Sequence, residues 1–203
     1  MYKKLFIFTI GYLIFIYIDM EFKFNSFFVM LFLFVFSFKT ITNLSFNEEI
    51  KLFKFNLIYF VMSILIMTTI VVCYNLIFGN IFEDYSLKTN IQTNIHNIIL
   101  IVLFSFFEEI LFRKYILENL LEHKNKFKSI INVSICFALV HFFSNTGILY
   151  AFLLSILLSY SFYKTKSVLI NILSHLYINL FVLFFLDEIL NFLNRLFKLS
   201  YVS

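Results

Sequence analysis

The stretch Asn97–Arg113, which reads NIILIVLFSFFEEILFR, decides how the rest of the chain is interpreted. It begins as an apolar run and then carries three charged residues, Glu108, Glu109 and Arg113, within a few positions of one another. An ionised side chain at the centre of a bilayer costs about 2.5–3.5 kcal/mol on insertion scales. Two adjacent carboxylates in an apolar run therefore require a specific reason, and we look for function there first.

The composition of the whole chain is that of a membrane protein. Of its 203 residues, 62% are hydrophobic and 14% are charged, whereas a soluble domain has roughly 25% charged residues. The mean hydropathy is +0.93. No stretch remains for a separate soluble domain, so we expect one all-α, polytopic membrane helical bundle.

Apolar runs recur along the chain, and each is a candidate transmembrane helix. We expect about seven such helices, with six or eight as alternatives, because several runs are shorter than the roughly 20 residues of an ideal span. From Glu188 onward the apolar residues alternate helically with polar ones, which predicts an amphipathic helix in the membrane interface. The runs are Leu5–Ile18, Ser26–Phe38, Leu57–Phe78, Asn97–Phe112, Ser129–Phe143, Ile148–Tyr163 and Val168–Leu186.

The basic residues predict the topology, because cytoplasmic loops of membrane proteins carry an excess of Lys and Arg. They flank the apolar runs, so the net charge of +4 indicates orientation in a membrane and not a nucleic-acid partner. We expect a cytoplasmic N-terminus, a polar outer loop at Asn80–Asn94 and a basic inner connector at Leu117–Lys128. The inner set is Lys3, Lys4, Lys39, Lys51, Lys54, Arg113, Lys114, Lys124, Lys126, Lys128, Lys164 and Lys166, and the outer set is Lys23, Lys88, Arg195 and Lys198.

The two glutamates are expected to have different surroundings. Glu109 and Arg113 are four residues apart and can pair on one helix face, whereas Glu108 lies about 100° around the helix. One carboxylate can then be neutralised locally while Glu108 faces the bundle interior, where a carboxylate can act as a general base on water. The alternative is that both glutamates lie at the membrane edge and pair with Arg113 and Lys114.

Two later apolar runs carry histidines. His141 follows Phe137 by one turn within Phe137-Ala-Leu-Val-His141, and His175 precedes Asn179 by one turn within His175-Leu-Tyr-Ile-Asn179. Taken singly, each could be an interhelical hydrogen bond. Taken together with Glu108 they fit one reaction, in which Glu108 deprotonates a water that His141 orients, and His175 and Asn179 donate to the developing oxyanion.

The three motifs in this order resemble those of the CAAX-protease and bacteriocin-processing (CPBP, or Abi) family of intramembrane endopeptidases, which includes the type II CAAX prenyl endopeptidases. The motifs are Glu108-Glu109-x-x-x-Arg113, Phe137-x-x-x-His141 and His175-x-x-x-Asn179. The resemblance implies that Glu108 is the catalytic base, that His141 helps to hold the water, and that His175 and Asn179 stabilise the oxyanion. Glu109 and Arg113 would support the first motif.

The resemblance also implies a division of the chain into three segments, and the chain differs from the family pattern at two places. Residues 1–95 would be N-terminal membrane helices, residues 96–187 the catalytic helices and residues 188–203 the amphipathic tail. Family members commonly have Gly after the motif Arg, where this chain has Lys114. They often have a Thr-Gly-Ser stretch, where this chain has Thr165-Lys166-Ser167.

From these residues and this resemblance we expect an integral membrane endopeptidase in the cell membrane of a bacterium, acting on a peptide or membrane-protein substrate, prenylated or not. No cofactor is expected. A zinc ion held by Glu and His is possible but not favoured, since the HExxH pattern is absent. Membrane lipid is the other expected partner, and the oligomeric state is left open. The alternatives are a non-enzymatic bacteriocin-immunity or accessory membrane protein of the same fold, and a proton-coupled transporter.

Overall fold

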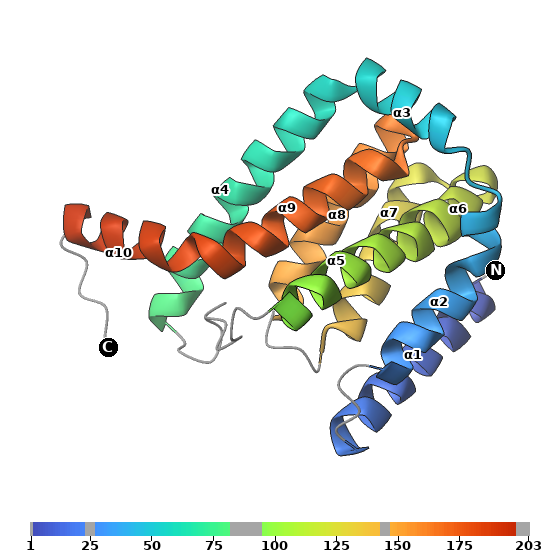
Figure 1. Cartoon of the computed structure of the whole chain (residues 1–203), viewed down its shortest axis with the longest axis horizontal. Helices are drawn as coiled ribbons and strands as arrows, with labels where there is room; N and C mark the ends of the chain where they lie inside the picture. The colour runs from blue at the N-terminus through green and yellow to red at the C-terminus, as the bar shows by residue number, and fades with distance from the viewer. Residues whose placement is uncertain (1, 23–26, 82–94, 143–146, 198–203) are drawn as a thin grey trace.

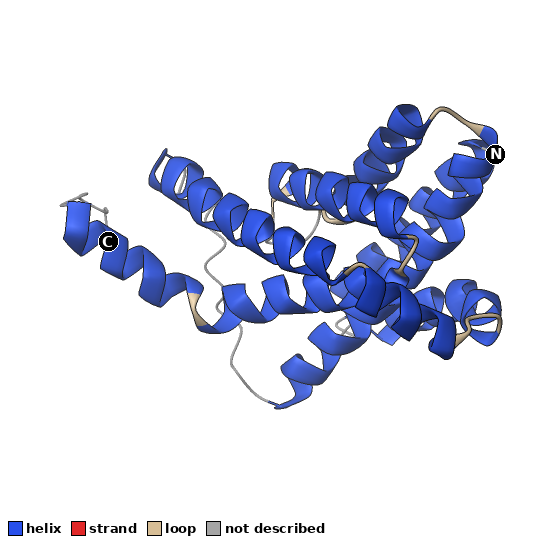
Figure 2. Cartoon of the chain, turned by 90° about the horizontal axis from the view of Figure 1, so that it is seen from above, coloured by secondary structure: helices blue, strands red, loops and turns tan. Residues whose placement is uncertain are grey.

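The computed structural model describes residues 2–22, 27–81, 95–142 and 147–197, and every regular element in these ranges is a helix (Figures 1 and 2). The all-α expectation is therefore confirmed for the described part of the chain. The elements are α1 (Tyr2–Phe22), α2 (Phe27–Thr42), α3 (Phe46–Phe55), α4 (Leu57–Ile81), α5 (Ile95–Glu109), η2 (Ile110–Leu117), α6 (Glu118–His123), α7 (Lys126–Val140), α8 (Ile148–Thr165), α9 (Val168–Phe184) and α10 (Leu186–Phe197).

Seven membrane spans are not confirmed. Among the described residues, three helices are long and apolar enough to cross a bilayer, namely Leu57–Ile77, Ile95–His123 and Ile148–Thr165. The helices α9 and α10 form a fourth candidate, bent by 59° at their junction. Helix α7 has 15 residues and is therefore about 22 Å long, which is short of the roughly 30 Å of a hydrocarbon core.

The second of these spans runs farther than the sequence predicts. The apolar run was expected to end at Phe112, but the helix continues through η2 and α6 to His123. The connector expected at Leu117–Lys128 is accordingly wrong in extent, because α7 already begins at Lys126. Arg113, one turn after Glu109 within this span, has no exposed surface. Glu108 consequently lies near the middle of a 29-residue span.

Helix α4 is the least buried of the three candidate spans among the described residues. Helix α4 has few polar residues, and only 17% of its span is buried by the rest of the chain. Its exposed side chains include Leu57, Ile58, Leu65 and Ile77. An outward surface of this kind is unfavourable in water and favourable in lipid.

Helix α5 with η2 forms the centre of the bundle. Helix α9 packs along α5, and the antiparallel pair α7 and α8 packs beside it (Figure 1). The pair α1 and α2 covers the remaining side, where α2 contacts η2 and α1 contacts α7. The larger of two apolar clusters lies around η2 and includes Leu33, Leu111, Phe112 and Phe162.

The short helix α3 is held against the start of α9 by a buried carboxylate. Glu49 is 4% exposed, and its Oε2 accepts hydrogen bonds from Ser167 Oγ at 3.0 Å and from the Leu169 backbone N–H at 3.2 Å. A carboxylate at a helix N-terminus satisfies free N–H groups and interacts favourably with the helix dipole. Glu49 thereby fixes the beginning of the helix that carries His175.

The sequence predicts a basic inner end, an amphipathic tail and a polar outer loop. The α3 helix, the turn between α8 and α9, and α6 lie at one end of the bundle (Figure 1). Of the predicted inner basic residues, Lys51 and Lys54 belong to α3 and Lys166 to the turn. Helix α10 is present where the amphipathic tail was predicted, with Leu190 buried and Leu196 exposed. The predicted outer loop at Asn80–Asn94 lies almost entirely outside the described residues.

Candidate active site

The first motif lies where the central span changes from an α-helix to a π-helix. Helix α5 ends at Glu109, and η2 begins at the next residue. At the end of η2 the backbone N–H of Glu118 bonds to the carbonyl of Arg113, five residues earlier, which is the π-helical pattern. Such wide turns are frequent at functional sites, and this one begins directly after Glu109 and includes Arg113.

Glu109 is the hub of a buried network. Its carboxylate has no exposed surface, and Oε2 lies 3.2 Å from Arg113 Nε. The other oxygen, Oε1, lies 2.9 Å from His175 Nδ1, and Asn171 Nδ2 donates to Oε2 at 3.4 Å. The pairing of Glu109 with Arg113 expected from their spacing is present. Because a buried charge is tolerated only when it is paired and hydrogen-bonded, these contacts explain how Glu109 can be fully buried.

Arg113 extends this network to α7 and α8. Its Nη2 donates to Ser155 Oγ at 3.1 Å, and its guanidinium carbon lies 4.7 Å from the centroid of the Phe137 ring. Its Nε and Nη1 are buried without a hydrogen-bond acceptor among the described residues, although Nε is the atom in ion-pair contact with Glu109. Arg113 therefore ties the first motif to the helix of the second motif, and it retains unused donors in the interior.

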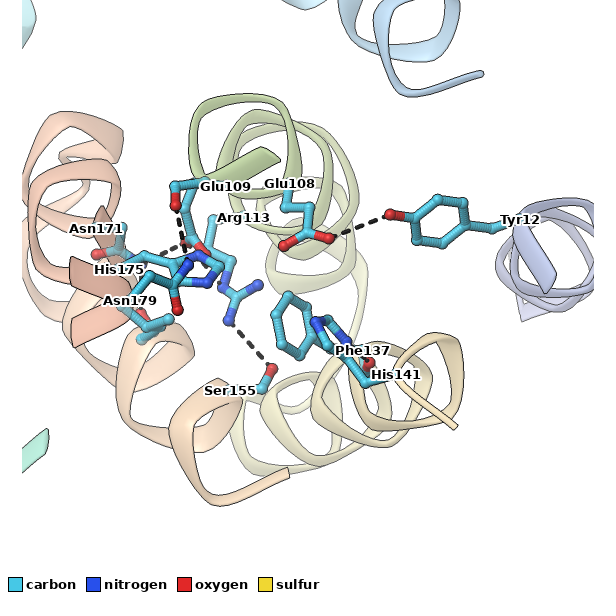
Figure 3. A network of polar contacts seen from close by, with 12 residues as sticks. Tyr12, Glu108, Glu109, Arg113, Phe137, His141, Ser155, Asn171, His175 and Asn179 are labelled. Atoms are coloured by element: carbon cyan, nitrogen blue, oxygen red, sulfur yellow. Dashed lines mark hydrogen bonds and ion pairs between the residues drawn. The ribbon is translucent and has the colours of Figure 1, made fainter. Parts of the chain in front are cut away.

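Glu108 lies on the other side of α5 from this network (Figure 3). Its Oε1 accepts a hydrogen bond from the Tyr12 hydroxyl at 3.1 Å, and the residue is 6% exposed. Tyr12 is itself fixed on α1 by stacking on Phe32, with ring centroids 5.5 Å apart. Glu108 is thus the carboxylate of the pair that does not belong to the ion pair.

His141 lies at the end of α7. We expected it inside an apolar helix, but α7 ends at Val140 and His141 caps it. Its ring stacks on Phe137 with centroids 4.4 Å apart, and its Nδ1 lies 2.8 Å from the Phe137 carbonyl oxygen. A carbonyl only accepts hydrogen bonds, so Nδ1 carries the proton, and Nε2 of a neutral His141 is the acceptor nitrogen.

The third motif is bound to α5 at two points. His175 contacts Glu109 as described, and Asn179 Nδ2 donates to Ser105 Oγ at 3.1 Å. The Phe137 ring lies between the two histidines, since its centroid is also 6.0 Å from that of His175, in an edge arrangement. All three motifs therefore meet around Phe137 and Arg113, beside the junction of α5 with η2 (Figure 3).

Two details differ from the arrangement that the sequence suggests. The carboxylate in contact with a motif histidine is Glu109, whose neighbour Glu108 bonds to Tyr12. The membrane-edge alternative also fails in its pairing, because Lys114 Nζ pairs with Glu118 at 3.1 Å. Both glutamates of the motif are buried.

Four contributors to the site were not identified from the sequence: Tyr12, Ser105, Ser155 and Asn171. Two of them had a signal, because Asn171 precedes His175 and Asn179 at intervals of four, and Ser105 precedes Glu109 and Arg113 at the same intervals, so each set shares a helix face. The other two, Tyr12 and Ser155, are single hydroxyl residues in apolar helices. Nothing in their spacing relates them to the motifs, and only the packing of α1 and α8 brings Tyr12 and Ser155 to the site.

No three His, Cys, Asp or Glu side chains come together as a possible metal site in the part of the chain that the structure describes. The acidic and imidazole groups of the site instead contact one another, a Tyr hydroxyl or a backbone carbonyl. Carboxylate and imidazole groups of this kind are suited to proton transfer and to hydrogen bonding with a reacting group.

Comparison with known families shows a match over the part of the chain that holds the motifs. The model of the Rce1-like family, the type II CAAX prenyl endopeptidases, matches residues 90–181. This segment holds all three motifs and confirms the resemblance to this protease family. No curated protein and no solved structure matches the chain. The match and the apolar helices together indicate an integral membrane protein.

Proposed function

We propose that this protein is an intramembrane endopeptidase that hydrolyses peptide bonds in peptides or membrane-associated proteins, including prenylated ones, with a water activated by glutamate. The match of residues 90–181 to a protease family supports the class of reaction. The buried groups of α5, α7 and α9 support the chemistry, since intramembrane ionisable residues are retained for function by default.

Glu108 is the proposed general base. It is the less constrained of the two glutamates, since Glu109 already neutralises Arg113. Glu108 takes a proton from the water as the water oxygen attacks the scissile carbonyl carbon. His141 helps to orient the water. Its Nδ1–H group donates a hydrogen bond to the Phe137 carbonyl, and its Nε2 can accept a hydrogen bond from the water.

His175 and Asn179 are the proposed oxyanion stabilisers. The attack converts the carbonyl oxygen into an oxyanion, and donors held in advance at that point lower the barrier. Glu109 accepts a hydrogen bond from the Nδ1–H group of His175, so an imidazolium at this position has a second N–H group, on Nε2, to donate to the oxyanion. Collapse of the tetrahedral intermediate breaks the C–N bond, and the proton held by Glu108 passes to the leaving nitrogen.

Glu109 and Arg113 are the proposed positioning pair. They do not contact the reacting atoms in this mechanism. Glu109 fixes the ring of His175, and Arg113 supports the Phe137 ring on which His141 stacks. The network of Glu109, Arg113 and Phe137 with the two histidines is the observation that best supports this function. It joins the helices of all three motifs in the interior of an apolar bundle.

The test is cleavage by the purified full chain in lipid nanodiscs. A library of membrane-anchored peptides, prenylated and unprenylated, is incubated with the wild type, with Glu108→Gln and with the control Glu48→Gln, whose side chain is exposed on α3. We expect the wild type and the control to give the same new peptide termini and Glu108→Gln to give none. We also expect cleavage to persist with a zinc chelator, since the mechanism uses no metal.

Two outcomes would contradict the proposal. Cleavage by folded Glu108→Gln at the wild-type rate would remove the base. Protection of cells against a bacteriocin that persists undiminished in Glu108→Gln, together with no cleavage by the wild type, would favour the non-enzymatic immunity function.

A further inference from the structure

Three lysines gather around one aromatic ring at the end of the bundle where α7 begins and α8 ends. Their ammonium nitrogens lie at similar distances from the centroid of the Tyr163 ring: 5.7 Å for Lys126, 5.7 Å for Lys164 and 5.9 Å for Lys166. Lys164 also lies 5.6 Å from the centroid of Tyr160. All three lysines are exposed. We call Lys126, Lys164 and Lys166 around Tyr163 the lysine cluster.

The positive charge of the lysine cluster is not balanced within the described part of the chain. None of its ammonium groups forms an ion pair with a described carboxylate, whereas the nearby Lys114 pairs with Glu118. A cation over a ring face gains a modest attraction, but three like charges around one ring also repel one another. An anion bound between them would remove that repulsion.

Lys166 adopts a backbone conformation that favours glycine. Its φ is +56°, and among the described residues it is the one non-glycine residue with a positive φ. Helices commonly end with Gly in this left-handed conformation, because a Cβ is unfavourable there. The chain therefore places a lysine where a glycine would be the more stable residue, and a strained position of this kind motivates the search for a role of its side chain.

The position of the lysine cluster suits a membrane headgroup. Helix α8 is a candidate span over Ile148–Thr165, so Lys164 and Lys166 lie at its very end. Lys126 is the first residue of α7, which packs antiparallel to α8. Tyr side chains and lysines at the end of a span lie at the depth of lipid headgroups.

We propose that the lysine cluster is a binding site for the phosphate headgroup of an anionic phospholipid, separate from the candidate active site. The three ammonium groups donate to the phosphate oxygens, and the Tyr163 ring holds the lysines together at the headgroup level. Lipid phosphate is the occupant that the site's location selects, because the cluster lies at the end of an apolar span. This site would anchor the α7–α8 pair at one depth in the membrane.

The experiment uses the purified full chain in a neutral detergent, with dioleoylphosphatidylglycerol and dioleoylphosphatidylcholine as probes and native mass spectrometry to count bound lipid. We expect the wild type to prefer phosphatidylglycerol by at least roughly fivefold, and each lysine removed to cost roughly fivefold in affinity. Lys166→Gly is the most informative variant. It should bind phosphatidylglycerol more weakly while its unfolding temperature stays equal or rises, since glycine relieves the left-handed backbone.

A matched control separates this site from general attraction by a basic surface. The triple variant Lys126→Gln/Lys164→Gln/Lys166→Gln removes the cluster, and Lys51→Gln/Lys54→Gln/Lys128→Gln removes the same charge from exposed lysines elsewhere at this end. We expect the first to lose the preference for phosphatidylglycerol and the second to keep it. Equal losses in the two triples, or unchanged binding in Lys166→Gly, would overturn the proposal.

Discussion

The two sides of α5 near its C-terminal end have different surroundings, although each presents a glutamate. On the side facing α9, Glu109 is fully buried and contacts Arg113, His175 and Asn171. On the side facing α1, Glu108 accepts one hydrogen bond from Tyr12 and keeps a small exposed fraction.

The different surroundings of Glu108 and Glu109 show how one motif can contribute both to stability and to catalysis. A step of one residue turns the side chain by about 100° around a helix, so two adjacent carboxylates necessarily face different neighbours. One can be paired to allow its own burial and to order the helices around it. The other can then remain available for proton transfer. If Glu109 serves mainly stability and Glu108 mainly proton transfer, substitutions on the two sides should differ in their effects on unfolding and on cleavage.

The largest expected effect on stability is on the α9 side. Arg113→Met leaves Glu109 without its cation in the interior, and breaking a buried ion pair costs about 3–5 kcal/mol. We expect the free energy of unfolding in detergent to fall by that amount. Lys114→Met is the control, since the Lys114 pair with Glu118 is partly exposed and such pairs contribute about 0–1 kcal/mol. Equal effects of the two variants would break the distinction.

A smaller effect on the same side is expected where α9 begins. Glu49→Gln replaces the charged acceptor of Ser167 and the Leu169 N–H, and hydrogen bonds to a charged group contribute about 1.5–3 kcal/mol. The neighbouring Glu48→Gln is the control, because Glu48 is exposed. Chemical denaturation of both variants measures the difference. If Glu48→Gln lost as much stability, the anchoring of α9 by Glu49 would be wrong.

The smallest effect on stability is expected on the α1 side. Tyr12→Phe keeps the ring that stacks on Phe32 and removes only the hydroxyl that bonds to Glu108. The loss of one hydrogen bond costs about 0.5–1.5 kcal/mol. We expect unfolding to change within that range while the cleavage rate falls, because the carboxylate is less well positioned. Tyr17→Phe, at an exposed tyrosine, should change neither quantity, and an unchanged rate in Tyr12→Phe would show that Tyr12 has no part in the site.

Much of this arrangement could be predicted from the sequence. The apolar composition predicts a helical membrane protein, and the four-residue spacing predicts the pair of Glu109 with Arg113, because both depend on local properties of the chain. The order of the three motifs predicts the family resemblance that the comparison confirms. The positions of the basic residues predict one basic end, and the structure places Lys51, Lys54 and Lys166 of the predicted inner set at the same end of the bundle.

The rest depends on packing that spacing does not encode. The contact of Tyr12 with Glu108 joins residues 96 positions apart, and it requires α1 to pack against the central span. The π-helix after Glu109 and the end of α7 at Val140 are local changes in hydrogen bonding without a Pro or Gly to mark them. The number of spans is similarly decided by how far helices continue past a charged residue. Arg113 is an example. Because it is paired with Glu109, it can be buried in the interior, and the helix continues beyond it to His123.

The paired variants Glu108→Gln and Glu109→Gln test the division of roles most directly. Peptide cleavage and the free energy of unfolding are measured on both purified proteins in the same nanodiscs. We predict that Glu108→Gln abolishes cleavage and leaves unfolding within about 1 kcal/mol of the wild type, whereas Glu109→Gln lowers the free energy of unfolding by about 3–5 kcal/mol because Arg113 becomes an unpaired buried charge. The reverse pattern, with Glu108→Gln cleaving normally, would contradict the assignment of Glu108 as the base.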